Sequence, residues 1–258
     1  MVTFEELLKK LLCSGIINPM KVIRYKHDLD FTYALGATLV FELLKTRPKS
    51  VRRIFIKPTL NKNTPEIQKL LTLAKDCKID IYESEKPFNV LSPKDNCFVI
   101  AEFTKTTSAL DPAKSNIVLV NPSDAGNIGT IVRTAVGLGY QNIAVISPAV
   151  DVYDPKAIRA TMGAIFHANV QYFANINEFL QLFPTHSRYS FMLKGAHNFD
   201  KTEIKAPFSL IFGNEASGLP DEYAELATSV KIPQTSEIDS FSLPIAASIA
   251  MYECKDIK

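Results

Sequence analysis

Short apolar runs recur through the second half of the chain. They lie at residues 117–120, 143–146, 191–193, 210–212 and 230–232. The run at 117–120 is four consecutive apolar residues, which is typical of a strand covered on both faces in a parallel sheet rather than of a half-exposed strand. Helical patterns occupy the intervals between the runs. The pattern therefore predicts an α/β domain built on a parallel sheet over residues 116–258.

The first half alternates helices and strands over shorter lengths. A capping box at Thr3–Glu6, followed by a leucine stripe, predicts an N-terminal helix within residues 1–19. Helical patterns then lie at 32–45 and 65–75, a helix or turn at 86–91, and strand patterns at 51–56, 79–82 and 97–103. We expect a small αβ domain over residues 20–104, joined to the second domain by a linker at 105–115.

The segment Asn116–Arg133 contains the clearest succession of strand, turn and helix. Asn127 precedes the apolar stripe of the helix as a candidate cap, and Gly129 and Arg133 lie off that stripe, one turn apart. Loops at the carboxyl end of a parallel strand often bind anionic or polar ligands. The segment is therefore a candidate site, although a tight turn followed by a solvated arginine is the alternative interpretation.

A second strand runs into a glycine-rich loop at Phe208–Pro220. Glu215 lies in this loop between Gly213 and Gly218, so the pattern places a carboxylate at a strand's carboxyl end. A tight turn with one exposed glutamate explains the same residues. The chain contains no G-x-G-x-x-G dinucleotide fingerprint and no G-K-[ST] phosphate loop.

The third strand-to-loop segment is Val230–Glu253. A polar loop follows the strand, and a strongly apolar helix starts near Ser242. Small residues on this helix would let another backbone approach closely. We expect this helix to be buried or to form a subunit contact rather than a cofactor site.

Charge is distributed unevenly along the chain. Residues 1–110 hold 18 Lys and Arg against 12 Asp and Glu, whereas residues 111–258 hold 11 against 15. Seven basic residues and no acidic one lie between Lys45 and Lys62. The basic first half would attract a polyanion such as RNA, although a solvated lysine-rich face is an equal alternative.

Composition limits the remaining classes of protein. The chain is 47% hydrophobic and 22% charged, and no apolar run approaches the roughly 18 residues of a membrane span. The N-terminus shows no signal-peptide layout. Four widely spaced cysteines without C-x-x-C, and four histidines without ligand spacing, indicate a cytoplasmic protein with neither disulfides nor a metal site.

Together the three segments carry a family resemblance. NPSDAGNIGTIVRTA, LIFGNEASGLP and IPQTSEIDSFSLPIAASIAMYE resemble, in order and spacing, the three motifs of the SpoU/TrmH branch of the SPOUT RNA methyltransferases. Lys156–Val170 resembles a fourth, weaker family block, and the likeness covers about residues 115–253. Residues 20–104 resemble the small αβ RNA-binding domain, akin to certain ribosomal proteins, that precedes the catalytic domain in many members.

The resemblance implies a fold, an activity and site residues. It implies a C-terminal trefoil knot, bound S-adenosylmethionine, a homodimer, and methylation of a ribose 2′-hydroxyl in RNA, with ribosomal RNA favoured over transfer RNA. The positions that match the family's catalytic side are Asn127, Arg133, Glu215 and Ser240, with Ser242 in the place of the usual asparagine. The positions expected at the cofactor are Leu193, Gly195, Gly213, Ile232 and Phe241. The basic residues expected at the RNA are Lys21, Arg24, Arg52, Arg53 and, as a secondary candidate, Arg159.

Two departures from the family pattern affect the expected activity. The usual Ser-Leu-Asn of the third motif is Ser240-Phe241-Ser242 here, which keeps a hydroxyl but loses the amide. Ala125 replaces a frequent proline. An RNA-binding assembly factor that retains the cofactor but has weak or no catalysis is therefore the main alternative. A methyltransferase acting on protein or on a small molecule is a more distant one.

In the expected mechanism, Arg133 is not the base. A guanidinium is effectively never deprotonated in a protein. We therefore expect Arg133 to clamp the neighbouring phosphate and to stabilise the developing alkoxide, while Glu215, Ser240 and Ser242 fix the geometry.

Overall fold

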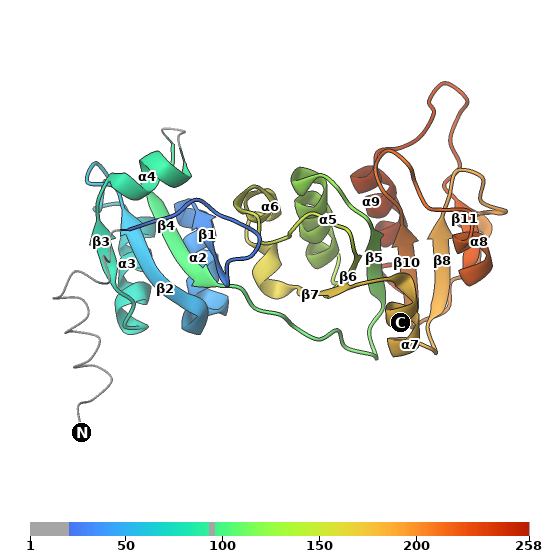
Figure 1. Cartoon of the computed structure of the whole chain (residues 1–258), viewed down its shortest axis with the longest axis horizontal. Helices are drawn as coiled ribbons and strands as arrows, with labels where there is room; N and C mark the ends of the chain where they lie inside the picture. The colour runs from blue at the N-terminus through green and yellow to red at the C-terminus, as the bar shows by residue number, and fades with distance from the viewer. Residues whose placement is uncertain (1–20, 93–95, 258) are drawn as a thin grey trace. The chain divides into compact units, whose positions relative to one another are not determined.

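The computed structural model describes residues 21–92 and 96–257, and it divides the chain into two units between Thr104 and Lys105 (Figure 1). The predicted helix within residues 1–19 lies outside the described residues. No helix in the described ranges is long and apolar enough to cross a membrane.

The first unit is a four-stranded mixed sheet in the order β1-β4-β2-β3. Its strands are β1 (Phe31–Leu35), β2 (Val51–Ile56), β3 (Ile81–Glu83) and β4 (Val99–Thr104). Its helices are α2 (Ala37–Thr46), η1 (Pro48–Ser50), α3 (Pro65–Asp76) and α4 (Lys86–Leu91). β4 is antiparallel to both β1 and β2, whereas β3 is parallel to β2.

One predicted helix of the first unit starts too early. The sequence pattern extends it from residue 32, but residues 31–35 form β1 and the helix begins at Ala37. Gly36 separates the two elements with a φ of 116°, a conformation that glycine adopts readily. The aromatic and β-branched residues before Gly36 favour a strand, and pairing with β4 outweighs the helical spacing.

The second unit is built on a seven-stranded sheet in the order β7-β6-β5-β10-β8-β11-β9. Its strands are β5 (Asn116–Val120), β6 (Asn142–Ile146), β7 (Asn169–Phe173), β8 (Ser187–Phe191), β9 (His197–Asn198), β10 (Phe208–Phe212) and β11 (Thr228–Lys231). Every neighbouring pair is parallel, which confirms the predicted parallel sheet. Strands β5, β6 and β10 are buried along their whole length, as their continuous apolar runs require.

The sequence pattern misplaces part of this sheet. The strand expected at 191–193 lies at 187–191, because β8 mixes serine and arginine with its aromatic residues and gives a weak apolar signal. Strands β7 and β9 were not predicted. β9 has only two residues, and β7 carries Gln171 and an exposed Tyr172 on an edge of the sheet.

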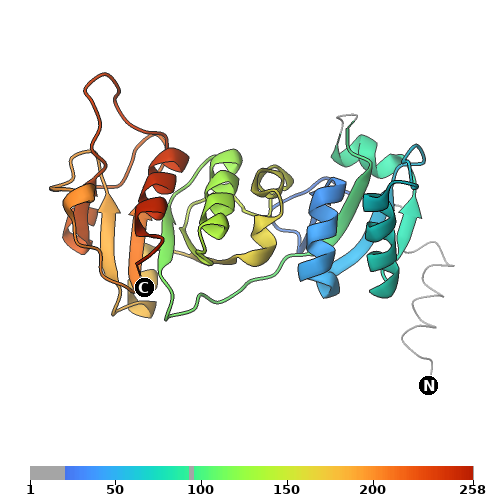
Figure 2. The ribbon, with the colours of Figure 1, turned by 180° about the vertical axis from the view of Figure 1, so that it is seen from behind.

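The described part of the second unit also contains five α-helices and two 3₁₀ turns. They are α5 (Ala125–Gly137), α6 (Pro155–Thr161), η2 (Ala164–His167), α7 (Ile176–Leu182), η3 (Phe199–Lys201), α8 (Tyr223–Leu226) and α9 (Leu243–Cys254). α5 packs against both α6 and α9, and Figure 2 shows α5 and α9 side by side. Elsewhere Phe179 of α7 and Tyr223 of α8 pack with Val118 and Ile211 of the sheet.

Residues 105–115, which the sequence predicts as a linker, make contacts within the second unit. Lys105 pairs with Asp151 at 2.9 Å. The backbone N–H of Leu110 donates to the Gln171 side chain at 3.1 Å, and the Leu110 side chain is buried. The segment therefore leads into β5 along the surface of the domain that it precedes.

Candidate active site

The carboxyl ends of four neighbouring strands bring most of the predicted site residues to one edge of the sheet. In the order β5-β10-β8-β11, Gly213 follows β10, Leu193 and Gly195 follow β8, and Ile232 follows β11. Because these strands are parallel, their carboxyl ends lie at the same edge.

Glu215 connects two of these loops. Its Oε2 accepts hydrogen bonds from the Ser123 N–H at 3.0 Å and from the Ser123 hydroxyl at 2.7 Å. Its Oε1 accepts from the Asp124 N–H and from the Asn127 side-chain Nδ2, both at 3.1 Å. The Nδ2 of Asn214 also donates to Oε2, at 3.3 Å. One carboxylate thus ties the loop after β10 to the loop between β5 and α5.

These hydrogen bonds determine the charge of Glu215. Partial burial opposes ionisation, but donation from Ser123 and Asn127 outweighs it and lowers the pKa of the Glu215 carboxyl to about 2. Glu215 is therefore an anion at neutral pH, and an anion with so low a pKa is a poor proton acceptor. Its contacts hold Ser123, Asp124 and Asn127 in place, and its role in catalysis stays a prediction.

The cap of α5 differs from the prediction. Asp124, not Asn127, occupies the N-cap position, and its Oδ1 accepts the Asn127 N–H at 2.8 Å. This bond, together with other N–H donation and Lys156, holds the pKa of the Asp124 carboxyl below its usual range against a smaller effect of burial. Asn127 is the third residue of the helix, so its side chain is available to Glu215. An Asp three residues before Asn127 was the signal that the sequence analysis overlooked.

Gly129 allows two helices to pack closely. It is buried, and a Cβ at this position would lie 2.5 Å from the Cβ of Ala160 and 2.6 Å from the carbonyl oxygen of Ala157. The expectation that Gly129 lies off the buried face is therefore wrong: glycine lets α5 and α6 approach closely.

Arg133 lies one turn after Gly129 on α5, and its side chain is exposed. It forms no hydrogen bond or ion pair with another residue in the described ranges, and it is not part of the Glu215 cluster. Its guanidinium is thus available to a ligand. Ser240 and Ser242, in the exposed stretch before α9, are likewise solvent-accessible, and Ser242 is the N-cap residue of α9 without a side-chain cap bond.

Two predicted cofactor glycines allow backbones to approach each other. A Cβ on Gly195 would lie 2.4 Å from the Val230 carbonyl carbon, and one on Gly213 would lie 2.2 Å from that of Gly218. The loops after β8 and β10 therefore pack tightly against β11 and against the turn closed by the Asn214–Gly218 bridge. Both glycines are required by this packing, whatever ligand the loops bind.

The remaining cofactor candidates offer apolar surface. Leu193 is 66% exposed, and Ile232 and Phe241 are half-buried. Exposed or half-buried apolar side chains beside backbone at strand ends suit a nucleoside-bearing ligand. The residues present therefore fit S-adenosylmethionine. No group of three or more His, Cys, Asp or Glu side chains within residues 21–92 and 96–257 is arranged to hold a metal ion.

The predicted RNA-binding residues differ in their surroundings. Lys21 and Arg24 are exposed, as is Arg159 on α6. Arg52 is paired with Asp30 at 2.5 Å and lies over the Phe31 ring.

Arg53 has a different environment from the other basic candidates. Its Nη2 pairs with the buried Glu102 at 2.6 Å and donates to the Lys21 carbonyl oxygen at 3.1 Å. These contacts hold the Arg53 guanidinium within the first unit, and its role as an RNA ligand stays a prediction.

Comparison with known proteins agrees with the motif assignment. The model of the SpoU rRNA Methylase family matches residues 114–252. An uncharacterized tRNA/rRNA methyltransferase of Synechocystis sp. is 30% identical over 146 residues, covering 55% of this chain and 53% of that relative. The 23S rRNA (uridine(2479)-2′-O)-methyltransferase of Streptomyces viridochromogenes is 29% identical over 148 residues, covering 53% of this chain and 50% of that relative. The matches thus span about half the length of these two relatives.

A solved structure extends the likeness to most of the chain. The AdoMet-bound rRNA methyltransferase from Sinorhizobium meliloti superposes with a TM-score of 0.75 at 25% identity, over 88% of this chain and 87% of that protein. The α/β architecture and the parallel sheet are therefore shared with a solved methyltransferase.

Proposed function

The chain belongs to the SpoU rRNA methylase family, and from this premise we propose that it transfers a methyl group from S-adenosylmethionine to a ribose 2′-hydroxyl of RNA. The observation that carries the proposal is the span of the family match. Residues 114–252 include Arg133, the Glu215 cluster and the loops after β8, β10 and β11. A relative named for 2′-O-methylation of 23S rRNA favours ribosomal RNA as the substrate, with transfer RNA as the second choice.

We propose that Leu193, Gly195, Gly213, Ile232 and Phe241 form the methyl-donor site. When bound, S-adenosylmethionine supplies an activated methyl group on a sulfonium. Leu193, Ile232 and Phe241 offer apolar contact to its nucleoside, and the close-packed loops at Gly195 and Gly213 fix the backbone around it.

In the proposed mechanism, Arg133 acts on charge rather than as a base. In such a transfer the ribose hydroxyl would lose its proton to solvent, the oxygen–methyl bond would form as the methyl–sulfur bond breaks, and the oxygen would become more negative before that bond is complete. A guanidinium without an intrachain partner among the described residues can hold the adjacent phosphate and stabilise this negative charge. Glu215 keeps its own charge and holds Ser123 and Asn127 in place. Ser240 and Ser242 contribute hydroxyls at the start of α9.

We also propose that the chain acts as a homodimer in the cytoplasm. α9 is strongly apolar, yet Ile245 and Tyr252 on it are 51% and 56% exposed. A second subunit would bury these side chains. Sedimentation equilibrium of the full chain should give a mass close to twice 28.7 kDa, and a monomer at micromolar concentration would contradict the proposal.

The expected trefoil knot is part of this proposal. After β11 the chain returns past two strands so that α9 packs against α5 and β10. A C-terminal segment that returns to the middle of the sheet in this way is what a knot of this kind requires. The basic first unit is proposed to bind RNA through exposed residues such as Lys21 and Arg24.

Ser242 motivates one second function, that of an RNA-binding assembly factor with weak or no catalysis. An assay with tritiated S-adenosylmethionine and total RNA from cells lacking the protein distinguishes the methyltransferase from the assembly factor. If the chain is a methyltransferase, less than one molecule of protein per molecule of RNA should transfer tritium to the RNA, and ribonuclease should release that label. No label with the parental chain, but label with Ser242→Asn, would instead support the assembly factor.

A further inference from the structure

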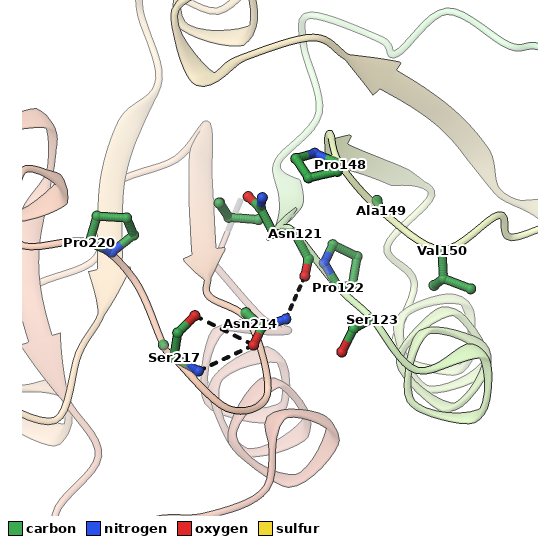
Figure 3. Close-up of a pocket in the computed structure, with 11 residues that line it drawn as sticks. Asn121, Pro122, Ser123, Pro148, Ala149, Val150, Asn214, Ser217 and Pro220 are labelled. Atoms are coloured by element: carbon green, nitrogen blue, oxygen red, sulfur yellow. Dashed lines mark hydrogen bonds between the residues drawn. The ribbon is translucent and has the colours of Figure 1, made fainter.

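A hollow of about 630 Å³ lies at the carboxyl ends of β6, β5 and β10 (Figure 3). It is lined by Val120, Asn121, Pro122, Ser123, Pro148, Ala149, Val150, Asn214, Ser217, Gly218 and Pro220. None of the five residues proposed for the methyl donor lines it. Its volume falls in the range of small-molecule sites, about 300–1,000 Å³.

The lining indicates a neutral ligand. The hollow has no charged residue among its eleven lining residues, which include three prolines and two valines. A phosphate group or the charged amino-acid part of a methyl donor would find no counter-charge there. A flat, neutral, partly polar group suits this lining, because it can lie on apolar faces and bind a few polar atoms.

Hydrogen bonds within and between the three loops hold the walls of the hollow in place without a ligand. The Nδ2 of Asn214 donates to the Asn121 carbonyl oxygen at 2.8 Å, and the Oδ1 of Asn214 accepts the Ala216 N–H at 2.9 Å (Figure 3 shows the first of these bonds). The Val150 N–H donates to the Pro122 carbonyl oxygen at 2.9 Å. A ligand would therefore enter a site that needs little reorganisation.

Asn121 presents an uncommitted amide to this hollow. Its backbone N–H donates to the Ile146 carbonyl oxygen at 3.0 Å, and its own carbonyl accepts from Asn214. Its side-chain amide makes no hydrogen bond to any residue in the described part of the chain, and in Figure 3 it points away from Asn214. The backbone is held at a φ of 54°, which sets the direction of its Cα–Cβ bond.

The hollow shares a wall with the Glu215 cluster. Ser123 and Asn214 line it and also donate to Glu215. A nucleotide whose base occupied the hollow would therefore lie beside the Glu215 cluster.

We propose that this hollow binds the base of the target nucleotide and that Asn121 reads the edge of that base. The proposal rests on the proposed function, since it names the part of the RNA that the same site recognises. A carboxamide offers one donor group and one acceptor, the pair that base edges match. RNA is read mainly through unstacked bases inserted into protein sites, which agrees with an uncharged, proline-lined hollow.

A binding measurement tests the hollow without requiring catalysis. Saturation-transfer NMR would use the full chain and the four ribonucleosides, with saturating S-adenosylhomocysteine to cover the donor site. At least one nucleoside should receive saturation, and its signal should fall threefold or more in Asn121→Gly and in Asn121→Asp. Both residues tolerate the positive φ. The exposed Asn177→Asp on α7 is the matched control and should behave as the parent.

Three results would overturn the proposal. They are binding of no nucleoside, equal signals in all four proteins, and loss of S-adenosylhomocysteine affinity in Asn121→Gly. The last result would assign the hollow to the donor's adenine instead.

Methyl-transfer kinetics separate this inference from the proposed function. Asn121→Gly and Asn121→Asp should lower kcat/KM for RNA by roughly 5- to 150-fold, the range of one base contact, with an unchanged KM for the donor. If both Asn121 variants methylated RNA with the parental kcat/KM, the base site would be refuted and the proposed function would stand. Nucleoside binding that depends on Asn121, in a chain that methylates no RNA, would contradict the proposed function and keep the base site.

Discussion

The Glu215 carboxylate accepts both the backbone N–H and the hydroxyl of Ser123, at 3.0 and 2.7 Å, from a position 92 residues later in the chain. Ser123 follows β5 and Glu215 follows β10, and these strands are neighbours in the sheet. Because donors from both loops converge on one anion, the relative position of the two loops depends on its charge.

Glu215→Gln should destabilise the protein in a pH-dependent way. The folded pKa of Glu215 is about 2, below its ordinary value of 4.5. Its contribution to stability is therefore complete above about pH 4.5 and is lost as the pH falls towards 2. We expect the free energy of unfolding at pH 7 to fall by about 1–2 kcal/mol, a value reduced for solvent screening of this half-buried group.

Urea denaturation at several pH values measures this effect. The difference between the parent and Glu215→Gln should shrink as the pH is lowered from 6 to 3. The exposed Glu225→Gln on α8 should show no comparable difference. A stability difference that stays constant across the pH range would contradict the assigned role of the Glu215 charge.

Arg133→Ala should remove catalysis without affecting folding. Loss of one group that stabilises transition-state charge typically costs about 10²- to 10³-fold in kcat. Arg133→Lys should recover only part of this loss, since an ammonium lacks the guanidinium's paired donors. Arg133 is exposed, so the free energy of unfolding should change by less than about 0.5 kcal/mol. RNA methylation by Arg133→Ala at near-parental rate would refute the mechanism.

Two glycines of α5 form a matched pair for a packing test. Gly129→Ala should lower the free energy of unfolding by about 1–3 kcal/mol, because its Cβ would overlap Ala157 and Ala160 of α6. Gly137→Ala meets no atom within 4 Å and should be neutral or stabilising by up to about 1 kcal/mol. Calorimetric unfolding of both variants decides the matter, and equal stabilities would show that α5 and α6 do not pack as described.

Arg53 and Arg24 should respond differently to removal of their charge. Arg53→Ala leaves the buried Glu102 carboxylate unpaired and should destabilise by about 3–5 kcal/mol. The exposed Arg24→Ala should leave stability unchanged and reduce the salt dependence of RNA binding by about one counterion. Denaturation curves and binding at several salt concentrations measure the two effects. A stable Arg53→Ala protein with weakened RNA binding would instead support a direct contact between Arg53 and RNA.

Continuous apolar strands were predictable because burial on both faces leaves a strong signal. The runs at Ile117–Val120 and Ile143–Ile146 differ from β5 and β6 by one residue each. β8 was misplaced because Arg188 and two serines interrupt its pattern, although the strand lies inside the sheet. The hydrophobic pattern reflects which residues are buried, and its signal is weak where polar side chains are buried.

The site was only partly predictable for a related reason. Motif order indicated that Glu215 and Asn127 belong to one site, and the structure joins them by a hydrogen bond. The contributions of Ser123 and Asn214 depend on loop geometry, which no spacing rule encodes. The same holds for Gly129. Only the close approach of α6 shows that a Cβ cannot be accommodated at this position.

The central claim is that this chain methylates a ribose 2′-hydroxyl of RNA. The most direct measurement is nucleoside analysis, by mass spectrometry, of ribosomal and transfer RNA from cells with and without the protein, followed by mapping of the modified position. We predict one 2′-O-methylated nucleotide that is absent without the protein, restored by the parental chain and not by Arg133→Ala. Identical methylation patterns in the two RNA pools, or a lost methyl group located on a base, would contradict the account.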